Sequence, residues 1–250
     1  MRYATLQNAR ALLTLLCFVT FQPFLSSKET IPSHSESSFY QEQRKAMVEK
    51  HLVQKGITDQ NVLNAMHTVK RHLFVDNGTL DSAYENNPLP IACRQTISQP
   101  FIVAYMLQEA RLHKNAYVLE IGTGSGYNAA LLSLLCTKVY TIEIHTQLGI
   151  AAEEKLKKLG YTNIDVIHDN GHKGFASAAP FDAIIATCAA KHVPQIWVDQ
   201  LKEDGILLMP LEESDGLQWL VRITKNKNTP QGFDQEKLLP VRFVPLLDGV

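Results

Sequence analysis

Two segments of the sequence carry residues whose types and spacing could do chemistry. In residues 118–127 an apolar run leads into a turn with three alternating glycines, Gly122, Gly124 and Gly126. Glycine lets backbone N–H groups approach a ligand closely, and a helix that begins after such a turn favours negative charge at its N-terminus. The turn therefore predicts a nucleotide or nucleoside pocket. Residues 95–100, Gln-Thr-Ile-Ser-Gln-Pro, precede it. A generic nucleotide-binding domain does not need this polar segment, so we expect a particular substrate beside the cofactor.

Two glutamates accompany the glycine turn. Glu143 ends the next predicted strand, at the spacing where an acid accepts hydrogen bonds from the ribose hydroxyls of a nucleoside. Glu120 lies inside the first predicted strand, where a buried carboxylate needs a partner such as a cationic ligand. Tyr127 stands where a dinucleotide fingerprint has its third glycine, which weakens the case for NAD. The alternative is that the glycines only make a tight turn and that both glutamates cap strands at the surface.

The polar segment has two compatible interpretations. Thr96 to Gln99 fits an N-terminal capping box, with Pro100 tolerated in the first helical turn. The same helix entrance would present free N–H groups and the hydroxyl of Ser98 to an anion.

Apolar periodicity predicts the elements that position these residues. The expected strands are 117–121, 138–143, 164–167, 182–187 and 206–209. The expected helices between them are 128–136, 148–159 and 194–201. This alternation is typical of an α/β fold with a doubly wound, mainly parallel sheet covered on both faces. An antiparallel C-terminal edge should follow, made of strands at 217–224 and 241–246.

Helices are expected to precede the sheet. Helical spacing over 39–55 ends at Gly56, Asp59 opens a second helix over 59–67, and a third follows Ser98. We therefore expect one folded domain at 39–250, in which 39–115 form a helical extension with the substrate segment and 116–250 the cofactor-binding sheet.

The first 38 residues are expected to lie outside this domain. Residues 1–28 contain basic side chains but no acid, and 11–21 are almost entirely apolar, which is the shape of an export signal. The apolar run is too short to span a bilayer as a helix. A polar linker over 26–38 should follow.

Composition excludes several classes of function. The formal net charge of −1, without a basic cluster interleaved with aromatics, predicts no nucleic-acid partner. The four cysteines show neither zinc-site nor disulfide spacing, so we expect no metal and assign them no chemistry; they are Cys17, Cys93, Cys136 and Cys188.

Several of these motifs resemble one family, the bacterial protein-L-isoaspartate O-methyltransferases. The matching stretches are 83–85, 88–91, 95–100, 118–127, 179–185 and 241–246, and the resemblance covers about residues 40 to 248. Residues 95–100 are its most specific element, because many S-adenosylmethionine-dependent methyltransferases share the glycine turn. The resemblance implies a Rossmann-like methyltransferase fold and S-adenosylmethionine as cofactor. It also implies methylation of the carboxylate of isoaspartyl residues in damaged proteins and peptides.

The resemblance also implies roles for individual residues. Ser98 would be the active-site residue that holds the substrate carboxylate, with Thr96 and Ile97 lining the passage between substrate and cofactor. The cofactor would bind the glycine turn, with Glu120 near its methionyl end and Glu143 on its ribose; Asp169 and Asn170 complete the expected cofactor-binding set.

The chain departs from the family pattern at two places. The family usually has Gly-Asp-Gly where this chain has Asp169, Asn170 and Gly171, so an amide replaces the expected adenine-binding carboxylate. A glycine-rich approach to Gln95 is replaced by Ala-Cys-Arg at 92–94.

Other functions and locations stay open at this level. The chain could be a methyltransferase of the same fold acting on another substrate, or a cofactor-binding module without activity. We expect a monomer in the cytoplasm, where S-adenosylmethionine is made. The alternative is a chain exported or membrane-associated through the apolar segment 11–25.

Overall fold

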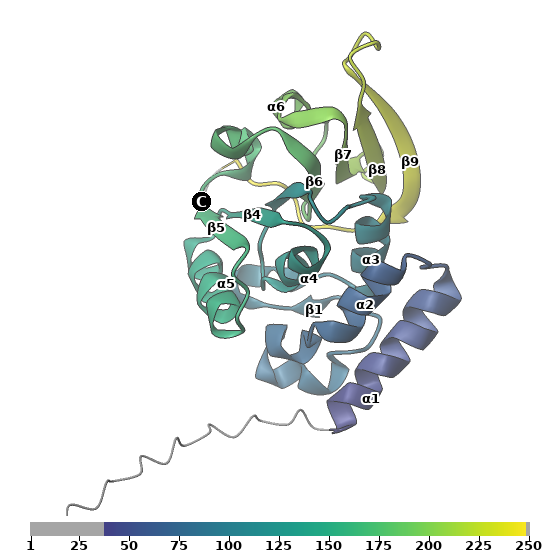
Figure 1. Cartoon of the computed structure of the whole chain (residues 1–250), viewed down its shortest axis with the longest axis vertical. Coiled ribbons are helices and arrows are strands. Elements are labelled where there is room, and N and C mark those ends of the chain that lie inside the picture. The colour runs from purple at the N-terminus through teal and green to yellow at the C-terminus, as the bar shows by residue number, and fades with distance from the viewer. Residues whose placement is uncertain (1–37, 249–250) are drawn as a thin grey trace, which may run out of the picture. The chain divides into compact units, whose positions relative to one another are not determined.

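The fold is built on a mainly parallel β-sheet, as predicted (Figure 1). The computed structural model describes residues 38–248, within which the main sheet has seven strands in the order β5-β4-β3-β6-β7-β8-β9. The parallel strands are β3 (Tyr117–Ile121), β4 (Lys138–Glu143), β5 (Ile164–His168), β6 (Phe181–Ala186) and β7 (Leu201–Glu212). The expected export-like segment and Cys17 lie outside the described residues.

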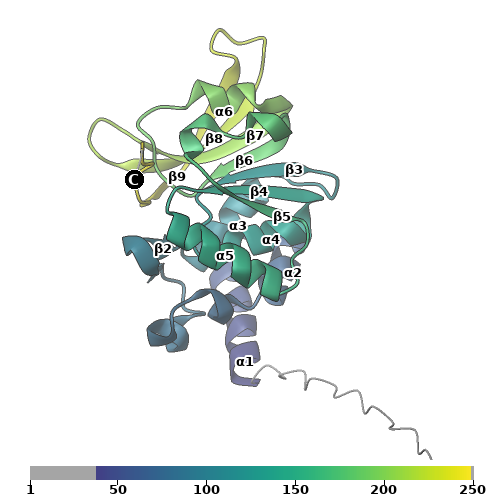
Figure 2. The ribbon, with the colours of Figure 1, turned by 90° about the vertical axis from the view of Figure 1, so that its left-hand side faces the viewer.

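Helices cover the two faces of the sheet unequally. Successive side chains of a strand point to opposite faces, so Val118 packs with the helices before and after it, whereas Leu119 packs on the other side with Trp197 of α6 (Gln195–Asp199). Figure 2 shows α6 on the face opposite α4 (Tyr127–Leu135) and α5 (Thr146–Lys158). The sheet is therefore buried on both faces, as its near-continuous apolar strands require.

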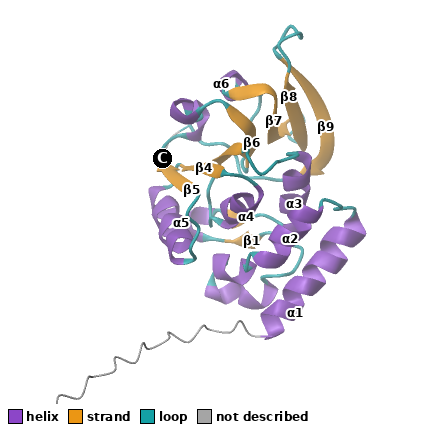
Figure 3. Cartoon of the chain, in the orientation of Figure 1, coloured by secondary structure: helices purple, strands orange, loops and turns teal. Residues whose placement is uncertain are grey.

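The N-terminal helices form a layer below the sheet (Figure 3). They are α1 (Ser38–Met47), α2 (Gln60–Thr68) and α3 (Pro100–Glu109). Short turns of other helix types connect them: a π-helical turn at Val48–Leu52 and 3-10 turns at Val53–Lys55, Arg71–Phe74 and Asn77–Ser82. Further 3-10 turns are Ala92–Arg94, Gly171–Lys173 and Ala176–Ala178. Asp59 caps α2 as predicted, since its carboxylate accepts the N–H groups of Asn61 and Val62.

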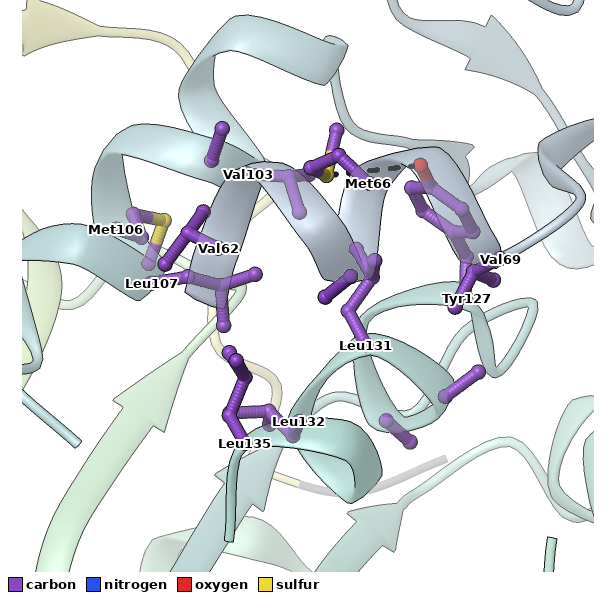
Figure 4. Packing of buried hydrophobic residues seen from close by; sticks show 14 of the residues in the cluster. Val62, Met66, Val69, Val103, Met106, Leu107, Tyr127, Leu131, Leu132 and Leu135 are labelled. Atoms are coloured by element: carbon purple, nitrogen blue, oxygen red, sulfur yellow. Dashed lines mark hydrogen bonds between the residues drawn. The ribbon is translucent and has the colours of Figure 1, made fainter. Parts of the chain in front are cut away.

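The helical layer shares its core with α4. Side chains from α2, α3 and α4 meet in Figure 4, where Tyr127 at the start of α4 points to α2. The Tyr127 hydroxyl donates to the sulfur of Met66 at 3.8 Å. Helix α4, which follows the glycine turn, therefore packs against α2 and against α3, the helix that begins at the end of the substrate segment.

The predicted C-terminal edge is antiparallel, but one of its strands was predicted at the wrong place. The last strands are β8 (Gln218–Lys225) and β9 (Phe233–Val241), so the expected strand at 241–246 is wrong. Four consecutive side chains of β9 are exposed and polar, residues 234–237, which hid this edge strand from an apolar pattern. Pro240 is tolerated because an edge strand has N–H groups that need no partner. Residues 242–248 instead cross the end of the sheet, where Ala189 exchanges backbone hydrogen bonds with Val244 and Leu246.

The predicted capping box is also wrong. Helix α3 begins at Pro100, and Gln99 at its N-cap makes no side-chain cap. Thr96 and Ile97 instead form strand β2 (Thr96–Ile97), which pairs with β1 (Leu89–Pro90). None of the helices in residues 38–248 combines the length and apolar character that a membrane crossing requires.

Candidate active site

The glycine turn lies at the carboxyl end of β3, where parallel sheets bind ligands. Its three glycines have positive φ, +98° at Gly122, +53° at Gly124 and +85° at Gly126. A Cβ atom on Gly122 would lie 2.3 Å from the Thr187 hydroxyl, which itself donates to the Gly122 carbonyl at 2.8 Å. Conformation and close packing both require glycine at position 122.

Three adjoining spaces surround this turn. The inner cavity is bordered by Gly122, Gly124, Glu143, His145 and Gly171. The middle cavity is bordered by Gly122, Gly124, Ser98, Ile97 and Asn128. The outer groove is bordered by Ser98, Gln99 and residues 240–244. Thr96 and Thr187 border all three, so these two threonines separate the glycine turn from the groove that holds Ser98.

Glu143 lies where the sequence predicted, in the inner cavity at the end of β4. The residue is 5% exposed, and its carboxylate accepts the N–H of Gly124 at 2.8 Å and that of His145 at 3.0 Å. A carboxylate has about four acceptor positions, so two remain for hydroxyl groups of a ligand. The interpretation of Glu143 as a surface cap is wrong, because the side chain is buried and faces the glycine turn.

Glu120 is fully buried behind the cavity wall. It accepts hydrogen bonds from the Asn128 amide at 2.8 Å and the Thr141 hydroxyl at 2.5 Å. Burial raises the pKa of this carboxyl to about 7, although both hydrogen bonds act in the opposite direction. Glu120 does not border the three spaces, whereas Asn128 borders the middle cavity. The surface-cap interpretation is wrong here too, and Glu120 reaches the site through Asn128.

Ser98 has the setting that its predicted role needs. It follows β2, whose pairing of Ile97 with Leu89 fixes the chain just before α3. Its hydroxyl makes no hydrogen bond to any of the residues that the structure describes, and it faces both the middle cavity and the outer groove. Ser98 is therefore free to bind an anion beside the glycine turn.

The structure does not bring Asp169 and Asn170 into the inner cavity. Asp169 is exposed and accepts the N–H of Asn170 at 2.6 Å. The Asn170 amide accepts the N–H of His172 at 2.9 Å and donates to the Asp248 carbonyl at 2.7 Å. Only Gly171 of this predicted turn borders the cavity. Cofactor binding by Asp169 and Asn170 stays a prediction.

Sequence reasoning missed several residues that border the site. Thr187 is a polar residue directly after an apolar strand, which is a usable signal, and His145 closely follows Glu143. Gln95 lies 3.4 Å from His145 and closes the inner cavity from the substrate segment. The pattern of 241–246 predicted a strand and did not place residues 244–247 at the cavity, because their position depends on the crossing of 242–248 over the sheet.

The remaining reactive groups have ordinary explanations. Burial raises the pKa of Cys188, which borders the inner cavity, to about 12, so its thiol stays protonated. Residues 38–248 contain no group of three or more His, Cys, Asp or Glu side chains that could hold a metal ion. The arrangement can bind a nucleoside and an anion side by side and hold them for direct reaction.

Known proteins are similar to this chain over most of its length. The family model described as protein-L-isoaspartate(D-aspartate) O-methyltransferase matches residues 42–250. A protein-L-isoaspartate O-methyltransferase from Opitutus terrae is 48% identical over 203 residues, covering 81% of this chain and 86% of that protein. One from Ignicoccus hospitalis is 46% identical over 211 residues, covering 83% and 99%.

Solved structures agree with this assignment. A protein described as a putative protein-L-isoaspartate O-methyltransferase from Plasmodium falciparum, in complex with S-adenosyl-L-homocysteine, has a TM-score of 0.70. It is 27% identical, and the match covers 82% of this chain and 99% of that one. The chain belongs to the protein-L-isoaspartate(D-aspartate) O-methyltransferase family.

Proposed function

We propose that this protein transfers a methyl group from S-adenosylmethionine to the carboxylate of an isoaspartyl residue in a damaged protein. One observation carries the proposal: Ser98, with a free hydroxyl, borders the same middle cavity as Gly122 and Gly124. The glycine turn offers a nucleoside site, and Ser98 lies on the side that opens to the outer groove. Family membership supports the same substrate and methyl donor.

The residues present fit S-adenosylmethionine as the methyl donor. Gly122 and Glu143 both border the inner cavity, and the Glu143 carboxylate has acceptor positions for ribose hydroxyls. When bound, the cofactor supplies a methyl group on a positively charged sulfur. The proposal includes Asp169 and Asn170, the other two predicted cofactor residues, because they directly precede Gly171 at the border of the inner cavity.

The chain's own task is to position the substrate. An isoaspartyl carboxylate is ionised at pH 7 and can attack a methyl group without a general base. The Ser98 hydroxyl donates a hydrogen bond to this carboxylate and orients it, while Thr96 and Ile97 line the passage. The backbone of the glycine turn and Glu143 hold the donor in line. Holding reactants in such a geometry supplies much of the rate increase of a bimolecular reaction.

The methyl ester leads to repair without further help from these residues. The backbone nitrogen of the next residue attacks the ester carbonyl, methanol leaves, and a succinimide forms. Its hydrolysis adds water across one of two C–N bonds, so part of the product is a normal aspartyl residue.

A methyl-transfer assay on an isoaspartyl peptide and its normal aspartyl twin tests the proposal. We expect transfer to the isoaspartyl peptide only. Transfer to neither peptide, with intact binding of S-adenosylmethionine, would favour a cofactor-binding module. Equal transfer to both would favour a methyltransferase with another substrate.

We also propose that the protein acts in the cytoplasm, because S-adenosylmethionine is made there, and that it acts there as a monomer. Fractionation of cells that make the full-length chain tests the location. A shortened product outside the cytoplasm would show that residues 1–38 act as an export signal instead.

A further inference from the structure

Arg71 is a buried cation that pairs with no carboxylate among residues 38–248. It is 0% exposed, and none of its partners among the described residues is an Asp or Glu side chain. Its Nε donates to the Ala83 carbonyl at 2.9 Å, and its guanidinium lies 5.0 Å from the centre of the Tyr127 ring. Burying a charged group is costly unless hydrogen bonds and other partners compensate for the lost water. Such a residue costs stability, and its partners show which parts of the site it connects.

One partner belongs to the wall that binds the donor. Tyr127 directly follows Gly126, begins α4 and borders the middle cavity with Ser98. Its hydroxyl is fixed to Met66 of α2, as Figure 4 shows. Arg71 covers the ring of Tyr127 and so limits the movement of the helix entrance beside the glycine turn.

The other partners belong to the wall that binds the substrate. Arg71 donates to the Ala83 carbonyl and, at 3.5 Å, to the Asn87 carbonyl. Asn86, between them, accepts the N–H of Phe101 through its side chain at 3.0 Å. Its carbonyl accepts the side-chain N–H of Gln99 at 2.7 Å. Residues 83–87 are therefore attached to the Ser98-Gln99-Pro100 segment at Gln99 and to Phe101 directly after it.

We infer that Arg71 is a positioning residue that sets the spacing between the glycine turn and Ser98. It contacts neither reactant, but Tyr127 and residues 83–87 connect it to both walls of the middle cavity. This inference rests on the proposed function, because spacing matters most when a carboxylate must meet a methyl group in line. A misplacement of about 1 Å can lower the rate of such a reaction by about 100-fold.

Two variants break the connection at different points. Arg71→Lys keeps the charge but lacks the planar fork that reaches two carbonyl groups and a ring together. Asn86→Ala leaves Arg71 intact and removes the acceptor for Phe101 N–H; Asn86 is half-buried, so this change is mild for folding. Arg222→Lys is the matched control, because Arg222 is also largely buried but pairs with Glu109 and Glu236 away from the three spaces.

The first readout is methyl transfer to an isoaspartyl peptide in a single turnover at saturating donor and peptide. We expect Arg71→Lys to lower this rate by about tenfold or more, since hydrogen bonds from a charged group contribute at least a tenfold factor in equilibrium. The dissociation constant of S-adenosylmethionine should change little. The double variant Arg71→Lys/Asn86→Ala should lose less rate than the product of the two single losses, because both substitutions interrupt the same connection between Tyr127 and residues 99–101.

The second readout, amide hydrogen exchange, does not depend on the reaction. Arg71→Lys should speed exchange of both the Phe101 and the Tyr127 amides by about tenfold. If Arg71→Lys does not fold, Asn86→Ala should still raise exchange at Tyr127, on the far wall. Arg222→Lys should leave both amides unchanged.

Two results would overturn the inference: rate losses of Arg71→Lys and Asn86→Ala that add independently, or exchange at Tyr127 that responds to neither variant. If the unaltered protein does not methylate the isoaspartyl peptide, the proposed function fails. The exchange data alone then decide whether Arg71 connects the two walls.

Discussion

Ser98 is the residue to which we assign the most direct contact with the substrate. Its hydroxyl has no partner among residues 38–248 and faces the outer groove. Ser98→Ala should lower kcat/KM for an isoaspartyl peptide by about 10-fold to 100-fold, the value of one hydrogen bond to a charged group. Ser133→Ala is the control, since the Ser133 hydroxyl donates to the Ala130 carbonyl within α4 and the variant keeps the Ser133 carbonyl that accepts from Asn163. Steady-state kinetics measure the effect, and calorimetry should show unchanged S-adenosylmethionine binding. An equal loss in both variants would contradict the role of Ser98.

Glu120 should make the stability of the fold depend on pH. Burial raises its pKa from 4.5 to about 7 in the folded protein, so between these values the unfolded chain loses its proton first. Stability from the protonated carboxyl is complete below pH 4.5 and is lost as pH rises to about 7. The free energy of unfolding should therefore fall, relative to Glu120→Gln, by about 3 kcal/mol over this range.

Denaturant unfolding of both proteins across the same pH values measures this difference. The variant supplies the control, because its amide cannot ionise while every other group is retained. Parallel pH profiles for the two proteins would show that Glu120 stays ionised in the fold.

At the scale of elements, the β3–α4 turn should tolerate no side chain at its first glycine. Gly122→Ala would place a Cβ 2.3 Å from the Thr187 hydroxyl at a φ of +98°. We expect a loss of about 1–3 kcal/mol in unfolding free energy and weaker S-adenosylmethionine binding. Gly78→Ala is the matched control, because no atom lies within 4 Å of the position that a Cβ would take there. Thermal unfolding and calorimetry distinguish the two; a variant at Gly122 that behaves like the one at Gly78 would refute the tight turn.

The turn between β1 and β2 should carry backbone strain. Cys93 and Arg94 both have a φ of +57°, a left-handed conformation that suits glycine. Arg94→Gly should raise the free energy of unfolding by about 0.5–1 kcal/mol, after the entropy cost of glycine is subtracted. Arg94→Ala, which keeps a Cβ, should not stabilise the protein. Denaturant unfolding compares the three proteins, and a less stable glycine variant would contradict this conformation.

Elements with a strong local pattern could be predicted from the sequence, whereas the others could not. Strands β3 and β4 have the predicted bounds because buried apolar residues recur along both of them. Strand β9 was missed because its exposed side chains lack that pattern, and the path of 242–248 depends on distant contacts with Ala189. Residues Thr96 to Gln99 fit a capping box by residue type, but Thr96 and Ile97 pair with β1 instead.

At the scale of the whole molecule, the site is formed by segments that are far apart in the sequence and close together in the fold. The glycine turn and Glu143 could be predicted, because they belong to neighbouring parallel strands whose carboxyl ends meet. Thr187, residues 244–247 and the connection through Arg71 come together only in the fold. The Asn170 amide donates to the Asp248 carbonyl, a contact that the sequence did not predict, and its role in cofactor binding stays a prediction.

The measurement that tests the account most directly uses one peptide with an isoaspartyl and a normal aspartyl residue. The protein is incubated with this peptide and S-adenosylmethionine, and fragmentation mass spectrometry locates the added methyl group before the ester decays. We predict a methyl group on the isoaspartyl carboxyl alone, and much less of it with Ser98→Ala. A methyl group on the normal aspartyl residue, or on neither residue while the donor binds, would contradict the account.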